Sequence, residues 1–311
     1  MSEPGHEMDG SADGDISIES PKPSSADTAT NHSARPPQTA FTGLRVAVQA
    51  LLPLGRMPPD NPETWRAAVW WFVPLGLLMG LAWAGVFRVS WRAFGEVAGL
   101  CPLSALAVVL LDVALLGYGR YWGLARVVDG IETEDGASRR SSNELRSVRG
   151  ILTLVVTVLA TWTLIVALPK GPGYWPSDWR ETWHLNELYP RPVFRPLILA
   201  PMWGCWAMLL AAIVGRARPE GGAVGLCAVV TPIVVLAGLF PVVGITTIYC
   251  SRRGNRLLGL IVGLIVLAVT HILSAIMGRR CRGQSMATLF AAGKAAELTF
   301  LLVYLALVSR S

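Results

Sequence analysis

Three charged side chains stand inside long apolar stretches of this 311-residue chain. Asp112 interrupts one such stretch, and Lys294 and Glu297 interrupt another near the end of the sequence. Burying an ionised group in a lipid environment costs several kcal/mol unless it is paired or hydrated, so these residues are candidates for function. Lys294 and Glu297 are three positions apart and can pair on one helix face, which would be a purely structural role. Asp112 has no partner nearby in the sequence and is the more suggestive residue.

A second group of candidates follows the Asp112 stretch, between positions 121 and 135. Asp129 and Glu132 lie three positions apart there, and their carboxylate oxygens could share a Mg²⁺ ion. Glu134 and Asp135 are at least as well explained as solvated acids balanced by the arginines that follow them.

A third group is the run from Arg216 to Gly222, which ends an apolar stretch. It holds two arginines, Glu220 and a glycine pair, a combination that could bind a phosphate together with its metal ion. A basic anchor at a membrane surface would explain the arginines alone. It would not require Glu220 or the glycines.

The composition places most of the chain in a lipid bilayer. Hydrophobic residues make up 52% of it and charged residues 15%, whereas soluble domains carry about a quarter charged residues. Uncharged runs of about 20 residues would aggregate in water, which excludes a soluble enzyme, a disulfide-stapled secreted domain and a nucleic-acid-binding module. The five cysteines form no CxxC pair, so they are interpreted as apolar packing residues.

The apolar stretches predict an all-α polytopic membrane bundle of about seven transmembrane helices, with a range of roughly six to eight. Backbone polar groups in lipid must satisfy each other, and the stretches are too long and uniform for a barrel. Gly221–Ser251 is uncharged for 31 positions, so Pro232 or Pro241 is expected to kink or divide it. The other predicted spans are Ala67–Phe87, Val97–Gly119, Gly150–Pro169, Pro196–Gly215, Leu257–Gly278 and Ala287–Val308.

Three parts are expected along the chain. Residues 1–40 hold seven acids against two bases, which predicts a disordered acidic tail. Residues 41–58 place apolar side chains at helical spacing beside two arginines, so residues 41–66 are predicted to form a juxtamembrane amphipathic segment. Residues 67–311 form the predicted helical membrane domain. After the tail the chain carries 25 bases and 14 acids, which fits loops that face anionic lipids or anionic substrates.

The distribution of arginines suggests an orientation. The loop at 119–149 holds six arginines, beginning with Arg120, and is therefore assigned to the cytoplasmic side. With seven spans, the loops at 216–220 and 279–286 share that side.

Small and polar residues within the spans predict helix contacts. The GxxxG spacings Gly76–Gly80 and Gly259–Gly263 indicate closely packed helix pairs. His271 lies inside a span, where a hydrogen bond to a neighbouring helix is expected.

Several segments occur in the order of a known family. They are Phe41–Pro58, Phe72–Gly80, Gly123–Ala125 with Asp129–Gly130, Gly150–Leu152, Ala200–Met208, Ala217–Gly221 and the closing loop and helix from Gly283 to Leu302. On these residues, over 41–308, the chain resembles the adenosylcobinamide-GDP ribazoletransferase family, also called cobalamin synthase. The most specific stretches are Ala200–Met208 and Ala217–Gly221. The acidic tail and a Trp-rich loop at 170–195 are additions.

The resemblance implies a Mg²⁺-dependent transferase of cobalamin biosynthesis in the cell inner membrane. Its substrates would be adenosylcobinamide-GDP and α-ribazole or its 5′-phosphate, and its products adenosylcobalamin or its 5′-phosphate and GMP. The lipid bilayer is the expected surrounding, no nucleic acid is expected as a partner, and the sequence leaves a homo-oligomer open.

The chain also departs from the family pattern. Trp122 and Arg126 stand where the family has aspartates, and Cys205 stands where it has an arginine. Lys294 replaces a glutamate close to Glu297, which is kept. With these changes, a substitute set is expected to carry the reaction. It comprises Asp129, Glu132 and Glu220 for the metal, Arg126 and Arg218 for phosphate, and Asp129, Glu220 and Glu297 as catalytic residues.

Three alternatives compete with this reading. A catalytically inactive member of the same family could serve as a membrane scaffold or cobamide binder, and the missing aspartates favour it. A small transporter could use Asp112, His271, Lys294 and Glu297 along a pathway, although inverted repeats are not evident. A phospholipid-type alcohol phosphotransferase is suggested by Gly123–Arg126, but Trp122 stands where that chemistry needs an aspartate.

Overall fold

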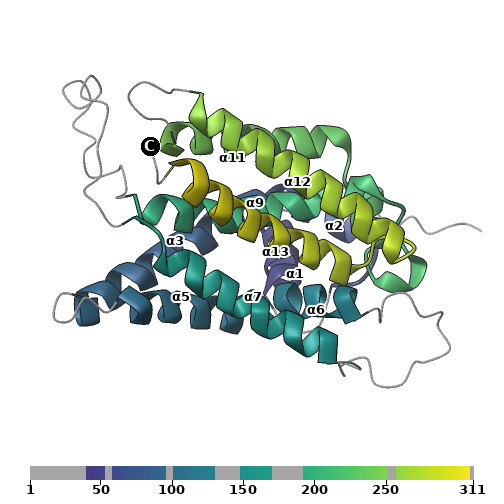
Figure 1. Cartoon of the computed structure of the whole chain (residues 1–311). Helices are drawn as coiled ribbons and strands as arrows, with labels where there is room; N and C mark the ends of the chain where they lie inside the picture. Colours follow the sequence, from purple (N-terminus) through teal and green to yellow (C-terminus); the bar gives the residue numbers. More distant parts are fainter. Residues whose placement is uncertain are drawn as a thin grey trace, which may run out of the picture. The chain divides into compact units, whose positions relative to one another are not determined.

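The computed structural model describes residues 40–52, 58–95, 101–129, 148–169, 192–250 and 257–308. These residues are helical apart from short turns and one isolated parallel bridge, which confirms the all-α fold (Figure 1). The α-helices are α1 (Ala40–Leu51), α2 (Pro62–Ala68), α3 (Phe72–Ser90), α5 (Cys101–Leu116), α6 (Trp122–Asp129), α7 (Val148–Val166), α9 (Phe194–Val214), α10 (Val224–Val229), α11 (Pro232–Cys250), α12 (Leu258–Arg280) and α13 (Met286–Val303). Short 3-10 or π segments extend them: η1 (Val69–Trp71), η2 (Trp91–Gly95), η3 (Gly117–Tyr121), η6 (Pro219–Gly221) and η7 (Tyr304–Val308). Residues 1–39, Glu132 and most of the Trp-rich loop lie outside the described residues.

The described part of the chain has the features of a multi-pass membrane protein. By length and composition, six of its helices are able to cross a membrane, and a bent pair brings the number to seven. The first of these runs continuously from Pro62 to Phe94, so it is longer than the predicted span. The bent pair joins Pro102–Leu116 to Gly119–Asp129 at an angle of 84°. The segment after Tyr121, which the sequence places in a loop, is therefore helical as far as Asp129.

Helix α9 is the centre of the bundle. It packs against α3, α11, α12 and α13. Of its most apolar 18-residue stretch 89% is buried, compared with 22% of the corresponding stretch of α11. Because α9 is apolar on all sides and contributes Trp203 and Trp206 to the core, the other helices can surround it. The two indoles meet edge to face with their ring centroids 5.4 Å apart.

The predicted close contact is confirmed at Gly76 and Gly80, and in the second GxxxG spacing at Gly259 but not at Gly263, where a Cβ atom would have ordinary contacts of 3.6 Å or more. A Cβ atom at Gly80 would overlap the carbonyl group of Ile198, and one at Gly76 would lie 2.8 Å from the Cα atom of Met202. These two glycines therefore bring α3 against the backbone of α9. On the other side of the bundle, Gly259 of α12 meets the backbone of Thr247 of α11 in the same way.

The long uncharged stretch is divided as its prolines predict. Pro232 begins α11, since its missing N–H group is not needed in the first helical turn. The preceding residues form the short helix α10, which ends at Val229. Pro241 lies inside α11.

We expect Gly80→Ala to destabilise the protein by about 1–3 kcal/mol, because the added methyl group has no space against α9. Gly85→Ala on the same helix is the matched control, since nothing lies within 4 Å of a Cβ atom there. Thermal unfolding in detergent measures both. Equal stability of the two variants would contradict the close α3–α9 contact.

Candidate functional site

Two of the loops predicted to share one side of the membrane are joined by backbone hydrogen bonds. The Arg218 amide donates to the Gln284 carbonyl oxygen at 2.9 Å, and the Gln284 amide donates to the Arg216 carbonyl oxygen at 2.7 Å. These bonds form the parallel bridge between Ala217 and Gln284. The segment after α9 and the turn before α13 therefore form one platform, defined here as residues 216–222 and 281–288.

The glycine pair of the platform has a backbone role. A Cβ atom at Gly221 would lie 2.8 Å from the Cβ atom of Ser285, so this position has no space for a side chain. Gly222 adopts a left-handed conformation with φ of 65°, which glycine tolerates best. Together the glycines let residues 216–222 pass directly over the start of α13.

Helix α13 begins with a capping box. The Ser285 hydroxyl oxygen accepts from the Thr288 amide at 3.2 Å, and the Thr288 hydroxyl oxygen accepts from the Ser285 amide at 2.8 Å. This reciprocal pair satisfies amide groups that the first turn leaves without helical partners. It fixes the point at which the platform turns into the helix.

Gln284 links the platform to the bundle, and the sequence analysis missed it. Its buried side chain donates to the Ser274 carbonyl oxygen at 3.4 Å and accepts from the Thr288 hydroxyl at 2.7 Å. With its two backbone bonds, this residue connects α12, α13 and the Arg216–Arg218 segment. Its uncharged side chain gave no chemical signal. The positive φ of 139° at the preceding Gly283 is visible only in the structure.

Helix α6 packs against the start of α13, where the platform also lies, and carries two of the predicted site residues. Gly123 lies against Ala287 and Phe290 at the start of α13, where a Cβ atom would be 2.7 Å from the Ala287 carbonyl oxygen. Arg126 and Asp129 follow one and two turns later, both half-buried, and their spacing places them on one face of α6.

The remaining predicted metal ligands are less fully described. Glu220 lies in η6 of the platform, but only its backbone belongs to the described structure, and Glu132 lies outside it. Among the described residues, no group of three His, Cys, Asp or Glu side chains gathers as a metal site would require. Asp129 and Glu220 are carboxylates on elements that converge on the start of α13, and their oxygen chemistry suits Mg²⁺.

Asp60 holds another element at this end. Its carboxylate accepts from the amides of Val224 and Gly225 at 3.1 and 2.5 Å and so joins α10 to the residues before α2. Burial and the nearby Asp60 raise the pKa of Cys227 in α10 to about 11. This thiol is therefore protonated at neutral pH and is not a nucleophile.

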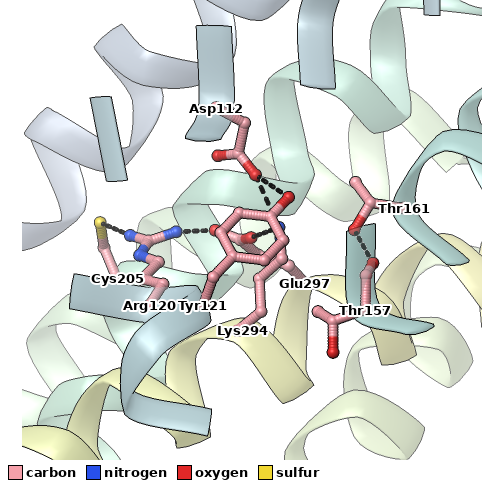
Figure 2. Close-up of polar contacts among 8 residues, drawn as sticks. All are labelled: Asp112, Arg120, Tyr121, Thr157, Thr161, Cys205, Lys294 and Glu297. Carbon is pink, nitrogen blue, oxygen red and sulfur yellow. Dashed lines mark hydrogen bonds and ion pairs between the residues drawn. The ribbon is translucent and has the colours of Figure 1, made fainter. Parts of the chain in front are cut away.

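Glu297 does not join these residues but belongs to a buried ionic network. Lys294 Nζ lies 2.7 Å from Asp112 Oδ2 and 3.1 Å from Glu297 Oε2, and Arg120 forms an ion pair with the other oxygen of Glu297 (Figure 2). All four side chains are at most 1% exposed. The predicted Lys294–Glu297 pair is confirmed, and Asp112 has the partner that the local sequence could not supply.

Neutral neighbours complete the network. The Tyr121 hydroxyl donates to Asp112 Oδ2 at 2.6 Å, and Lys294 Nζ lies 4.1 Å from the centre of the Tyr121 ring (Figure 2). Arg120 also donates to the Cys205 sulfur at 2.9 Å. Gly204 gives the Arg120–Glu297 pair its space, because a Cβ atom there would lie 2.6 Å from Glu297 Oε1.

The placement of Arg120 corrects the sequence analysis. Arg120 was expected in a cytoplasmic loop, but it lies in η3 and is completely buried in the bundle. Its ion-pair partner, Glu297, is on α13, far away in the sequence. The number of arginines after the apolar run therefore could not show that Arg120 is buried. Glu297 lies ten residues beyond Ala287, or about 15 Å along α13. The geometry therefore favours a structural role for Glu297.

Comparison with known proteins identifies the family. The model of a family described as cobalamin-5-phosphate synthase matches residues 43–307. The chain belongs to the cobalamin-5-phosphate synthase family. This match runs from α1 to η7 and includes the platform, α6 and the buried network, which confirms the resemblance.

One curated relative is similar over part of its length. It is an adenosylcobinamide-GDP ribazoletransferase from Bradyrhizobium diazoefficiens, 29% identical over 140 residues. The aligned region covers 42% of this chain and 51% of the relative, so the chain spans about half the length of the curated relative it matches. No solved structure matches the chain.

Lys294→Met should lower the free energy of unfolding by about 3–5 kcal/mol, because it leaves Asp112 buried without its cation. The double variant Lys294→Met/Asp112→Asn removes that unpaired charge and should recover at least half of the loss. Unfolding in mixed detergent micelles compares the unchanged protein, the two single variants Lys294→Met and Asp112→Asn, and the double variant. A double variant as unstable as the two single losses added together would contradict the coupling of these side chains.

Proposed function

We propose that the chain is an adenosylcobinamide-GDP ribazoletransferase of the cell inner membrane. It would join adenosylcobinamide-GDP to α-ribazole or its 5′-phosphate and release GMP. The observation that carries this proposal is the family match over residues 43–307, which includes all the elements that form the platform and α6. The name of the curated relative supports the same reaction.

In this reaction a ribose hydroxyl of α-ribazole forms a new bond to the phosphorus that bears the cobinamide. The anhydride bond of the diphosphate breaks, GMP leaves with that bond's oxygen, and the proton of the attacking hydroxyl is released to solvent. Such transfers depend on positioning and on cations that neutralise charge on the phosphate oxygens.

Arg218 is the residue best placed to hold the diphosphate. Its backbone is fixed to Gln284, it is half-buried beside Gly283, and its guanidinium can bind phosphate oxygens in pairs. Arg126 on α6 supplies a second cation from the other side of the α13 start. Both residues lie at the end of the bundle that we assign to the cytoplasm, where the polar substrates are available.

Mg²⁺ would be held by Asp129 and Glu220, with Glu132 as a further ligand, and would supply additional positive charge at the phosphate oxygens. Asp129 is contributed by α6 and Glu220 by η6 of the platform. The chain's own part in the reaction is therefore to fix these two elements against the start of α13.

The purified full-length protein in detergent should form cobalamin and GMP from adenosylcobinamide-GDP and α-ribazole with Mg²⁺, and EDTA should abolish the reaction. Asp129→Asn should raise the Mg²⁺ concentration needed for half-maximal rate by at least tenfold, a loss of about 1.4 kcal/mol. Absence of turnover, when a family member with the complete aspartate motif is active alongside, would overturn the proposal in favour of a non-catalytic homologue.

Arg218→Ala should reduce kcat/KM by about 10- to 150-fold, the loss of one charge-assisted interaction of about 1.5–3 kcal/mol. Arg216→Ala is the matched control, because this exposed residue is two positions away and takes part in the platform through its backbone. We expect Arg216→Ala to stay within about twofold of the unchanged protein. Equal losses of kcat/KM in the two variants would show that both arginines act only through long-range attraction, which would contradict a direct contact between Arg218 and the diphosphate.

A further inference from the structure

The outer face of α12 carries a polar residue among apolar ones. One face of this helix packs against α9, α11 and α13, whereas the opposite face is exposed. In Figure 1, α12 runs alongside α11 and α13. The large apolar side chains on the exposed face are Leu260, Ile261, Leu264, Ile272 and Ile276. His271 is exposed on the same face.

His271 lies deep within the predicted hydrocarbon layer. The stretch Leu257–Gly278 contains His271 but no Asp, Glu, Lys or Arg, and its midpoint lies between Leu267 and Ala268. At 1.5 Å per residue, His271 is about 5 Å from that centre along the helix, while the hydrocarbon layer extends about 15 Å to either side. Its short side chain cannot reach the polar headgroups from this depth.

The hydrogen bond expected for His271 is not found within the described part of the chain. No described residue forms a hydrogen bond or an ion pair with its imidazole, so the partner expected on a neighbouring helix is not among the described residues. Polar side chains in transmembrane helices usually face the bundle interior or pair with another group, because lipid offers them no partner. A face that presents such a group outward is therefore expected to be covered by another helix.

We propose that this face of α12 is the contact surface of a homodimer, with His271 of each copy bonded to His271 of the other. Two copies with the same topology are related by a twofold axis along the membrane normal, so each residue meets its equivalent at the same depth. A neutral imidazole has one donor and one acceptor nitrogen and can therefore bond to its own copy. A side chain that only donates or only accepts could not do so.

Small residues on the same face support a close approach of the two helices. Ala268 lies three residues before His271 and is exposed, and Ala275 lies four residues after it and is half-buried. Ala268 and Ala275 are two turns apart on this face, and small residues are typical of helix contacts in membranes, where packing and interhelical hydrogen bonds drive association. The contact is independent of the proposed reaction, because the platform and α6 are not part of this face.

The dimer can be measured with the full chain, fused to donor or acceptor fluorescent proteins and reconstituted into phosphatidylcholine–phosphatidylglycerol vesicles. Energy transfer is recorded over a range of protein-to-lipid ratios. His271→Leu should weaken the dimer about 5- to 30-fold, as expected from an interhelical hydrogen bond of about 1–2 kcal/mol. His271→Asn, which keeps a donor and an acceptor, should retain most of the affinity.

Two further variants test whether the outer face of α12 forms the dimer contact, beyond the single hydrogen bond between the His271 side chains. Ala268→Leu should also weaken the dimer, whereas Ala237→Leu on the exposed face of α11 should leave it unchanged. Thermal unfolding in detergent confirms that each variant is folded. Energy transfer at the level of random proximity, or a dimer that survives both His271→Leu and Ala268→Leu, would overturn the proposal. Association only with another membrane protein would do the same.

Discussion

The ion pairs around Lys294 are the constraint on which the rest of the bundle depends. Asp112, Arg120, Lys294 and Glu297 carry two negative and two positive charges, and each is buried where water cannot reach it. A single member left unpaired would cost several kcal/mol. The charges come from α5, η3 and α13, and Gly204 of α9 gives them space. These elements therefore reach a favourable state only when they assemble together.

The same network determines where the proposed site lies. Arg120 and Tyr121 turn inward from η3, and at this point the chain bends by 84° between α5 and α6. The bend directs α6 across the start of α13, so that Arg126 and Asp129 approach the end of the bundle where the platform lies. Gln284 holds the platform from the other side through α12 and α13. The buried network, whose four charges cancel, thus positions the charged residues of α6 beside the platform.

Local patterns predicted much of this structure, whereas contacts between distant residues escaped them. The spans, the division at Pro232, the GxxxG contacts and the Lys294–Glu297 pair follow from spacing within one helix. The cationic partner of Asp112 lies 182 positions away, and Arg120 follows an apolar run directly, so neither ion pair could be inferred from neighbouring residues. The exposure of His271 could not be predicted because α12 is apolar on all sides, and periodicity then does not show which face is covered.

Three of the departures from the expected family pattern fall into two groups with different consequences. Cys205 and Lys294 stand at positions inside the bundle, where Arg120 donates a hydrogen bond to the Cys205 sulfur and Asp112 balances the charge of Lys294. Arg126 is different, because it replaces an expected aspartate on α6, beside the proposed diphosphate site. An aspartate there would act on phosphate only through a metal ion, whereas an arginine can bind phosphate oxygens directly. On the proposed reaction, this site therefore neutralises the diphosphate with more protein cations and fewer metal ligands than the family pattern implies.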